Sequence, residues 1–382
     1  MKILLSGVET NNKGAELMLY AILQEIERKY PDAEVFIPAA NIRQGVDYVK
    51  TPLKLRILHQ RFVDRVIGKL HINGILRRLH LPKITPKLII PEGVEYFIDG
   101  SGFVFSDYLK IRDGGVALWD CLLKKLYHRG CKIVFLPQGF GPAEMQNTKK
   151  LFSVLSKYAS VIMPREKASF DYIEKSGVVD MKMVKMFPDF TSLVEGVFPE
   201  KFVHLKNGIA IIPNLRMIDK GAVSKEDYKK LLNSIVELGK RRGHIVYLLN
   251  HEGKADEMFA FELRNDLSGR IEVVTGLNAL EVKGLISSSY LVITSRFHGV
   301  ASALNSGVPC LATSWSHKYK ELFADYGMDN CILPLDDINR ALEMVKDYLS
   351  EERNQKISEH LGLQVPKIKA QTKQMWEYVW SV

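Results

Sequence analysis

Short apolar runs and longer amphipathic stretches alternate along the whole chain. Apolar runs bounded by turn residues are typical of buried strands, and apolar residues three or four positions apart are typical of helices. The predicted strands cover residues 2–6, 34–38, 96–99, 132–136, 161–163, 183–186, 208–212, 244–249, 271–274, 291–293, 310–312 and 331–333. The predicted helices cover residues 13–29, 116–128, 148–158, 167–175, 225–240, 256–266, 279–287, 300–305 and 319–326, with a helical tail over 338–382. Strands that alternate with helices predict parallel α/β sheets.

The alternation forms two series, which predicts two similar domains in this chain of 382 residues. The stretch 191–207, which contains Gly196 and Pro199, has no strong periodicity and separates the two series. We expect an N-terminal domain over residues 1–195 and a C-terminal domain over residues 205–350. The tail over 351–382 is expected to pack back on the N-terminal domain.

The composition is that of a soluble globular protein, with 46% hydrophobic and 25% charged residues. The first residues become polar too early for a signal peptide, and no apolar run reaches the roughly 18 residues of a transmembrane helix. The four cysteines are scattered without a CxxC pair, so neither a disulfide framework nor a metal site is predicted. These features predict a cytoplasmic protein.

Most of the net charge of +9 lies in one segment, residues 53–83. It carries eight Lys and Arg residues against the single acid Asp64, and apolar residues recur in it at helical spacing. Such a segment is typical of a helix on an anionic membrane surface at the inner face of the plasma membrane, and equally of a core-facing helix with a solvated basic side. Nucleic acid is a weaker alternative, because the segment lacks interleaved aromatic residues and no nucleic-acid motif occurs elsewhere.

Polar residues follow the predicted strands of the first half of the chain. Ligands collect beyond the carboxyl ends of strands in open α/β sheets, so these positions are candidates for binding. They are Asn12 and Glu16 after the first strand, Asp99 and Ser101 after the third, Gln138 after the fourth and Arg165 after the fifth. Asp189 comes after the sixth and either caps the next element or holds a catalytic partner; capping is the favoured interpretation.

In the second half, the most informative stretch runs from Ser295 to Gly299. Here an apolar run ends in Arg296-Phe297-His298 and passes directly into a predicted helix. This order places a fixed cation, an imidazole and backbone N–H groups together, as a small multiply charged anion requires. Further polar residues follow neighbouring strands: Arg216, His251 and Lys318. Basic residues at equivalent topological positions indicate one ligand that carries several negative charges.

Six segments, in this order, resemble the polysaccharide pyruvyl transferase family. They are Asn11-Asn12-Lys13-Gly14-Ala15-Glu16, Asp99-Gly100-Ser101-Gly102, Pro137-Gln138-Gly139-Phe140-Gly141-Pro142, Arg165-Glu166 with Ser169, Pro188-Asp189, and Ser295 to Gly299 with Gly307-Val308-Pro309. Phe297 stands where the family usually has leucine, and Pro188-Asp189 reverses the family's Asp-Pro order.

The resemblance implies a GT-B-like architecture, in which two Rossmann-like domains enclose the active site in the cleft between them. It also implies phosphoenolpyruvate as the donor, and a product in which pyruvate bridges two sugar hydroxyls as a cyclic ketal. The family's donor-site residues match Arg165, Arg296, Phe297 and His298 of this sequence. The acceptor is then a glycan of a polysaccharide repeat unit or of a precursor linked to polyprenyl diphosphate.

Combined with the positions at strand ends, the resemblance gives a full set of predicted site residues. The predicted catalytic residues are His298, Arg296 and Asp99. The predicted donor-binding residues are Arg165, Arg216, Ser295, Arg296, Phe297, His298, Gly299 and Lys318, and the predicted acceptor-binding residues are Asn12, Glu16, Asp99, Ser101, Gln138 and His251. His298, Asp99, Asp189 and Glu16 are all candidates for the acid that protonates the donor. No metal and no cofactor is expected.

Two alternatives are a nucleotide-sugar glycosyltransferase of the same architecture and a non-catalytic membrane-surface protein. The first usually offers an acidic residue to the ribose of the nucleotide. Here the stretch after Trp315 is basic first, and Glu321 follows only later. The intact Arg-x-His pair argues against the second alternative.

Overall fold

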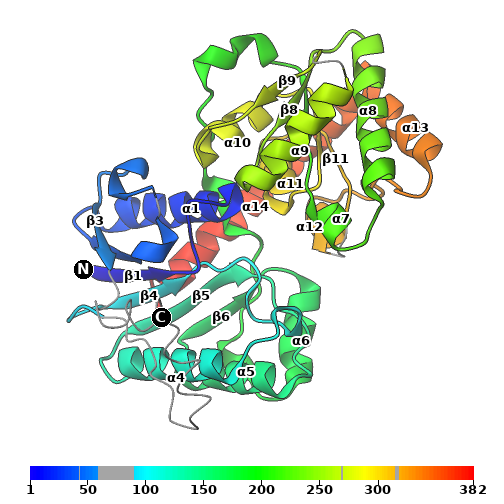
Figure 1. Cartoon of the computed structure of the whole chain (residues 1–382). Helices are drawn as coiled ribbons and strands as arrows, with labels where there is room; N and C mark the ends of the chain where they lie inside the picture. The colour runs from blue at the N-terminus through cyan, green and yellow to red at the C-terminus, as the bar shows by residue number, and fades with distance from the viewer. Residues whose placement is uncertain (43, 59–89, 268–269, 315–317) are drawn as a thin grey trace, which may run out of the picture. The chain divides into compact units, whose positions relative to one another are not determined.

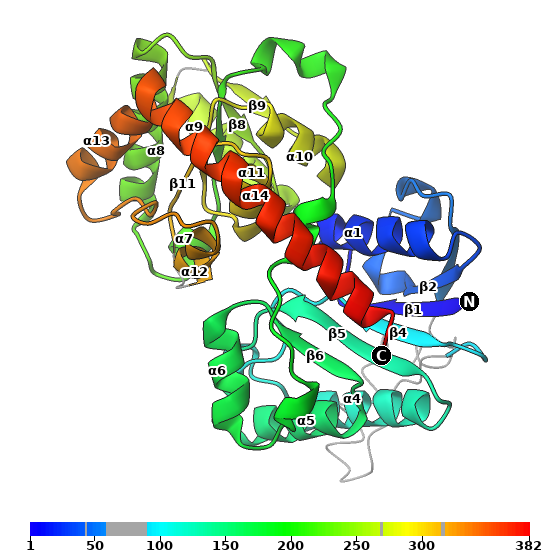
Figure 2. The same cartoon turned by 180° about the vertical axis from the view of Figure 1, so that it is seen from behind.

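The computed structural model describes residues 1–42, 44–58, 90–267, 270–314 and 318–382. These residues form two compact units, which are drawn in Figures 1 and 2. Unit 1 comprises Met1–Thr10, Ile22–Phe187 and Trp376–Val382, and unit 2 comprises Asn11–Ala21 and Pro188–Met375. Among the described residues, no helix is long and apolar enough to cross a membrane.

Unit 1 is built on a parallel sheet whose strands are ordered β3-β2-β1-β4-β5-β6. The strands are β1 (Lys2–Ser6), β2 (Glu34–Pro38), β3 (Lys54–Leu58), β4 (Tyr96–Asp99), β5 (Lys132–Gln138) and β6 (Val161–Pro164). Strand β4, in the middle of this order, is buried at every position, as expected for a strand covered on both faces, and the last strand, β6, is buried at every position as well. The helices are α4 (Asp113–Tyr127), α5 (Gln146–Tyr158) and α6 (Lys167–Ser176), and α4 and α5 lie side by side along one face of the sheet (Figures 1 and 2).

Unit 2 contains a second parallel sheet, ordered β11-β10-β7-β8-β9. Its strands are β7 (Ile209–Ile212), β8 (Val246–Leu249), β9 (Glu272–Val274), β10 (Leu291–Thr294) and β11 (Cys310–Ala312). Its helices are α7 (Arg216–Asp219), α8 (Lys225–Arg241), α9 (Gly253–Asp266), α10 (Ala279–Ser287), α11 (Phe297–Asn305), α12 (Lys318–Asp325) and α13 (Ile338–Tyr348). In both sheets the first strand, β1 or β7, is internal and the order in which strands are added reverses beside it, which places a topological switch point there.

Two long helices contribute residues to both units. Helix α1 (Lys13–Lys29) begins in unit 2 and continues in unit 1, and helix α14 (Glu351–Val379) begins in unit 2 and ends in unit 1. This division differs from the predicted domains 1–195, 205–350 and 351–382. Residues 11–21 and 188–195 belong to unit 2, and only the last seven residues of the tail belong to unit 1.

The aromatic end of the tail is held firmly in unit 1. Trp376 is fully buried, and the Trp380 ring makes edge-on contacts with Tyr30 and Tyr96 at centroid distances of 5.2 and 5.3 Å. The indole N–H of Trp380 also donates to Glu25 Oε1 over 2.9 Å. Large aromatic side chains with a satisfied polar atom contribute strongly to a core, which explains why the chain end is ordered here.

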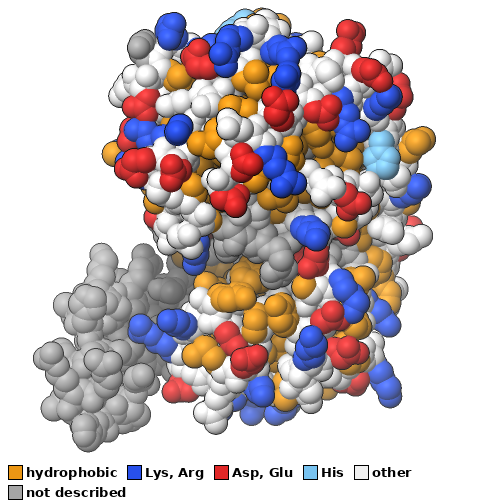
Figure 3. Space-filling model, turned by 90° about the vertical axis from the view of Figure 1, so that its right-hand side faces the viewer, with side chains coloured by type: hydrophobic (Ala, Val, Ile, Leu, Met, Phe, Trp, Pro, Cys, Tyr) orange, Lys and Arg blue, Asp and Glu red, His pale blue; other side chains and the backbone are white. Residues whose placement is uncertain are grey.

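Three predicted elements differ from the structure. Residues 183–186 and 331–333 are not strands; each contributes a single bridge, at Val184 and at Ile332. The part of the basic segment 53–83 that is described begins with β3 rather than a helix, because Lys54–Leu58 pairs in register with β2. Residues 59–89, which carry most of the basic segment, lie outside the described residues. On the face drawn in Figure 3, basic and acidic side chains are interspersed.

Close backbone packing in unit 2 depends on Gly284 of α10. An ideal Cβ at this position would lie 2.3 Å from Val197 O, and Val197 N donates to Leu280 O on the same helix. We expect Gly284→Ala to lower the free energy of unfolding by about 2 kcal/mol, because backbone atoms cannot move aside cheaply. Gly362→Ala on α14 is the matched control, since nothing lies within 4 Å of its Cβ position. In urea denaturation the control should gain about 0.5 kcal/mol, and equal effects in both variants would contradict this account.

Candidate functional site

The predicted Arg-Phe-His segment lies in unit 2 where β10 passes into α11. Ser295, the first of the two residues between them, is fixed by five hydrogen-bond partners, one of them Ile212 O, which accepts from Ser295 N over 3.1 Å. Its hydroxyl contacts the Tyr228 and Thr313 hydroxyls, and its carbonyl oxygen accepts from Asn214 Nδ2 over 2.7 Å and from Tyr319 Oη over 2.8 Å. Ser295, predicted to bind the donor, therefore anchors the turn that presents Arg296 and His298.

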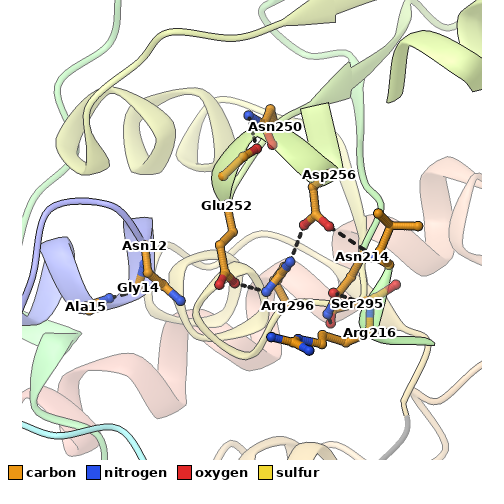
Figure 4. A network of polar contacts seen from close by, with 12 residues as sticks. Asn12, Gly14, Ala15, Asn214, Arg216, Asn250, Glu252, Asp256, Ser295 and Arg296 are labelled. Carbon is orange, nitrogen blue, oxygen red and sulfur yellow. Dashed lines mark hydrogen bonds and ion pairs between the residues drawn. The ribbon is translucent and has the colours of Figure 1, made fainter. Parts of the chain in front are cut away.

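Arg296 lies between two carboxylates, as Figure 4 shows. Its Nη1 forms an ion pair with Glu252 and its Nη2 forms one with Asp256. Asp256 is also held by Leu215 N, which donates to its Oδ1 over 3.1 Å. The third donor of the guanidinium, Nε, is buried and has no hydrogen-bond partner among the described residues. An unused donor of this kind is a feature of sites that bind a further acceptor.

Burial determines the titration of this cluster. Because Asp256 is removed from water, its pKa rises to about 6. Burial also lowers the pKa of Arg296 to about 10, which still leaves the guanidinium charged at neutral pH. The cluster therefore holds a permanent cation beside one carboxylate that titrates near physiological pH.

His298 follows in the first turn of α11. Its Nε2 lies 3.5 Å from Asp189 Oδ2, and both side chains are largely buried. Gly14 lies against the other edge of the imidazole, where an ideal Cβ would come within 2.4 Å of His298 Nδ1. Any side chain at position 14 would displace the ring, so glycine is required there by close approach rather than by backbone angle.

His251 lies near the same cations. It is 4% exposed, and its Nδ1 is buried without a hydrogen-bond partner among the described residues. Burial and the charges of Arg296, His298 and Lys13 lower its pKa well below the usual value, so its imidazole is neutral at physiological pH. His251 was predicted to bind the acceptor, but the structure groups it with the predicted donor-binding residues.

The N-terminal loop of the chain belongs to this group too. The backbone of Asn12 forms an isolated antiparallel β-bridge with Glu252, and the Asn12 Oδ1 accepts from Gly14 N over 2.8 Å. Glu16 is fully buried; it pairs with Lys13 at 2.6 Å and accepts from Ala279 N over 3.1 Å. Asn12 and Glu16 were predicted for the acceptor side of an N-terminal domain, whereas the structure places both in unit 2 beside Arg296 and His298.

The remaining donor residues predicted in unit 2 are less enclosed. Arg216 is half exposed and lies 3.7 Å from Asp219. Lys318 Nζ lies 5.6 Å from the centre of the Phe297 ring, which is itself buried and contacts the His298 ring edge-on at 5.3 Å. Gly299 permits α11 to pack on β10, because its ideal Cβ would lie 2.5 Å from Thr294 Oγ1.

Three of the predicted acceptor residues lie in the interior of unit 1. Asp99, Ser101 and Gln138 are at most 2% exposed. Asp99 Oδ1 accepts from Ser101 N over 3.1 Å and from Gln138 Nε2 over 3.2 Å, and burial raises the pKa of Asp99. This is the geometry of a turn-forming aspartate, and it supports a structural role more strongly than contact with a sugar.

Arg165 is also buried in unit 1. Its Nε donates to Glu166 Oε2 over 2.9 Å, and Glu166 in turn accepts from the Ser169 hydroxyl. Ser169 Oγ also accepts from Phe140 N over 2.7 Å and lies 3.0 Å from Phe140 O. The Arg-Glu-x-x-Ser pattern thus forms one buried network that fixes the guanidinium beside the Gly139–Gly141 turn.

Sequence reasoning missed Glu252 and Asp256, the two carboxylates that hold Arg296. Glu252 follows β8, at a strand end like the residues that were selected, so its position was a usable signal. Asp256 lies one turn inside α9, where an acidic residue is ordinary, and nothing in the sequence distinguishes it. Among the described residues, no group of three His, Cys, Asp or Glu side chains is arranged to hold a metal ion.

Comparison with protein families gave one match over most of the chain. A family model described as polysaccharide pyruvyl transferase matches residues 12–317. The matched range includes both Arg165 and the Arg296-Phe297-His298 segment. A search of curated proteins found no match.

Solved structures resemble the fold at low sequence identity. Anabaena Alr3699/HepE, solved in complex with UDP, is 12% identical with a TM-score of 0.62, and each chain is covered completely. The UDP-GlcNAc 2-epimerase from Neisseria meningitidis bound to UDP-GlcNAc is 10% identical with a TM-score of 0.59 over the whole of both chains. The UDP-GlcNAc 2-epimerase from Methanocaldococcus jannaschii is 13% identical with a TM-score of 0.55, over 92% of this chain and 94% of that one. These similarities and the two parallel sheets confirm the predicted fold class, two Rossmann-like domains of the GT-B type.

Proposed function

Because the chain belongs to the polysaccharide pyruvyl transferase family, we propose that it transfers pyruvate from phosphoenolpyruvate to two hydroxyls of a sugar. Members of this family are transferases of polysaccharide biosynthesis. The product in this proposal is a cyclic ketal on a polysaccharide repeat unit or its lipid-linked precursor, and inorganic phosphate is released. The chain's own side chains suffice for this scheme, so no cofactor is part of it.

One observation carries the proposal: the cationic surroundings of His251. Arg296, His298 and Lys13 each lower the pKa of this buried imidazole, so the three groups act on one small region of unit 2. Two nitrogen atoms there, Arg296 Nε and His251 Nδ1, are buried without hydrogen-bond partners among the described residues. A carboxylate or phosphate oxygen supplies the acceptor that Arg296 Nε lacks.

The carboxylates Glu252 and Asp256 set a condition for binding. Glu252 is 29% exposed and can rotate into water, whereas Asp256 is 4% exposed. An incoming trianion therefore displaces Glu252 and leaves Asp256 to hold the guanidinium in orientation. This exchange offsets part of the binding energy and favours ligands with more than one negative group.

The reaction requires two additions at C2 of the donor. An acid protonates C3, and a sugar hydroxyl attacks the oxocarbenium-like C2 while a base takes its proton. The second hydroxyl then forms its bond to C2 as the C2–O bond to phosphate breaks, and its proton passes to a base. His298 is suited to proton transfer and to hydrogen bonding with the departing phosphate. Arg296 would hold a carboxylate or phosphate group of the donor, and Arg165 is the second arginine that the family resemblance assigns to donor binding.

The acceptor in this proposal is linked to polyprenyl diphosphate at the inner face of the plasma membrane. The support for a membrane contact is the basic, apolar-striped sequence of residues 53–83. If it is correct, the protein binds vesicles of anionic lipid at low salt, and charge reversal of Arg77 and Arg78 weakens that binding. Equal binding to neutral and anionic vesicles would exclude the contact.

The proposed reaction is tested by phosphate release from phosphoenolpyruvate across galactose, mannose and glucosamine acceptors. We expect one acceptor class to gain the mass of one pyruvyl group, and Arg165→Ala to lose about 100-fold or more in turnover. Arg353→Ala is the matched control, because Arg353 is half exposed on α14, where it pairs with Asp347 at 3.2 Å and lies over the Tyr348 ring at 5.8 Å. Stabilisation by UDP- or GDP-sugars in a thermal shift, without phosphate release, would instead favour the glycosyltransferase.

A further inference from the structure

The two carboxylate oxygens of Asp189 contact different groups. Oδ1 accepts from Thr191 N over 3.0 Å and from the Thr191 hydroxyl, which caps the short helix Phe190–Leu193. Oδ2 lies 3.5 Å from His298 Nε2. The capping interpretation of Asp189 is therefore confirmed, and a second contact accompanies it.

The contact between Asp189 and His298 is enclosed. Asp189 is 5% exposed, and His298 Nε2 is buried. At 3.5 Å the two atoms lie just beyond ordinary hydrogen-bond length, and His298 Nε2 has no closer hydrogen-bond partner among the described residues. Gly14 lies against the Nδ1 edge of the ring. Because Gly14 has no side chain, it leaves room for the imidazole in this position.

Lys283, a buried lysine of α10, interacts electrostatically with the Asp189 carboxylate. Lys283 is 2% exposed, and its Nζ donates to Thr191 O over 3.2 Å. Burial lowers its pKa to about 8, and the charge of Asp189 opposes that shift. The positive charge of Lys283 favours the ionised form of the Asp189 carboxylate, in which Oδ2 is an acceptor.

We propose that Asp189 is a positioning residue that fixes His298 as the Nε2–H tautomer. An ionised carboxylate only accepts hydrogen bonds, so the Nε2 that faces it must carry a proton. In the neutral imidazole, Nδ1 is then the bare nitrogen and is the atom that takes a proton from the acceptor hydroxyl. This assignment of Nδ1 rests on the proposed function; the tautomer itself does not.

Asp189→Asn tests the inference with little disturbance of the fold. The cap requires an oxygen opposite Thr191 N, so the new amide places its NH₂ group toward His298 Nε2. An NH₂ group needs an acceptor, which forces the proton from Nε2 to Nδ1. We expect ring ¹⁵N chemical shifts, recorded at alkaline pH on the full chain, to show Nε2–H in the wild type and Nδ1–H in the variant. The His298→Gln spectrum identifies the signal.

Turnover provides the second measurement. We expect kcat of Asp189→Asn to fall on the order of 10³-fold with KM within about threefold, because the nitrogen that should accept a proton now carries one. Thr191→Val, which retains the carboxylate and the backbone cap, should keep the wild-type tautomer and kcat within about threefold.

Each outcome decides between the two proposals. An Nδ1–H wild type, or a variant that keeps Nε2–H, overturns the positioning role whatever the turnover. A tautomer that switches in a protein without phosphate release from phosphoenolpyruvate supports the positioning role and counts against the proposed function. A switch without loss of kcat supports tautomer control and refutes Nδ1 as the proton acceptor.

Discussion

Replacing His298 with alanine is expected to reduce pyruvyl transfer by about 10³-fold, the largest effect on activity that we predict. The imidazole is the group at the start of α11 best suited to move protons near neutral pH, and Asp189 and Gly14 hold it in place. Removing it leaves the cationic cluster intact. We therefore expect binding of phosphoenolpyruvate to persist in calorimetry while phosphate release nearly stops.

His360→Ala is the matched control for this prediction. His360 also lies in unit 2, and its Nε2 contacts the Tyr326 carbonyl at 2.8 Å, far in sequence from the strand-end residues. Its replacement should leave kcat within about threefold. A His298→Ala enzyme with more than a tenth of wild-type turnover would remove His298 from the proposed proton transfer.

Replacing Arg296 with methionine is expected to cost the largest amount of stability, about 3–5 kcal/mol. The guanidinium is 13% exposed, and its removal leaves Asp256 buried at 4% exposure without a cation. Glu252 contributes less to the loss, because it is exposed enough to be hydrated. Urea denaturation measures the change, and Arg296→Met combined with Asp256→Asn should recover at least 1 kcal/mol, since no buried charge remains.

The loss of stability in the Arg296→Met variant should also depend on pH. Burial raises the pKa of Asp256 from 3.8 to about 6, so within that range the folded protein binds more protons than the unfolded chain. The free energy of unfolding then falls as pH rises through this window, and it falls more steeply once Arg296 no longer offsets the carboxylate. The Arg296→Met variant should therefore be closest to wild type near pH 4 and furthest from it above about pH 7. A difference that is constant with pH would contradict burial of an ionised Asp256.

The elements that the sequence predicted well are those whose signal is local. The strands at 96–99 and 310–312 and the helix at 279–287 match the structure residue for residue, because a continuous buried strand or a capped helix follows from neighbouring side chains. Residues 183–186 and 331–333 failed for the opposite reason. They are apolar and short, but each lacks a full partner strand, which only the tertiary fold can supply.

The candidate site shows the same division. Arg296 and His298 were found because they interrupt an apolar run at a strand end. Glu252 and Asp256, the carboxylates that pair with Arg296, were not selected, because they come from a segment far from it along the chain. Asp189 was named as a possible catalytic partner, but its contact with His298 could not be predicted from the sequence. The sequence predicted that a bound anionic ligand would lie among the arginines. In unit 2 the carboxylates of Glu252 and Asp256 already lie against the Arg296 guanidinium. Asp99 was selected on the same positional argument as Arg296, but it is enclosed by its own turn.

The division of the chain has a consequence for synthesis on the ribosome. Every residue of unit 2 has been translated once Met375 is added, whereas unit 1 still lacks the buried Trp376 and Val379 and the contacts of Trp380. The strands β1 and β4 are therefore translated well before Trp380, whose ring packs against Tyr30 and Tyr96. All residues of unit 2 are thus available for packing seven residues before those of unit 1, although unit 1 contains the earlier part of the chain.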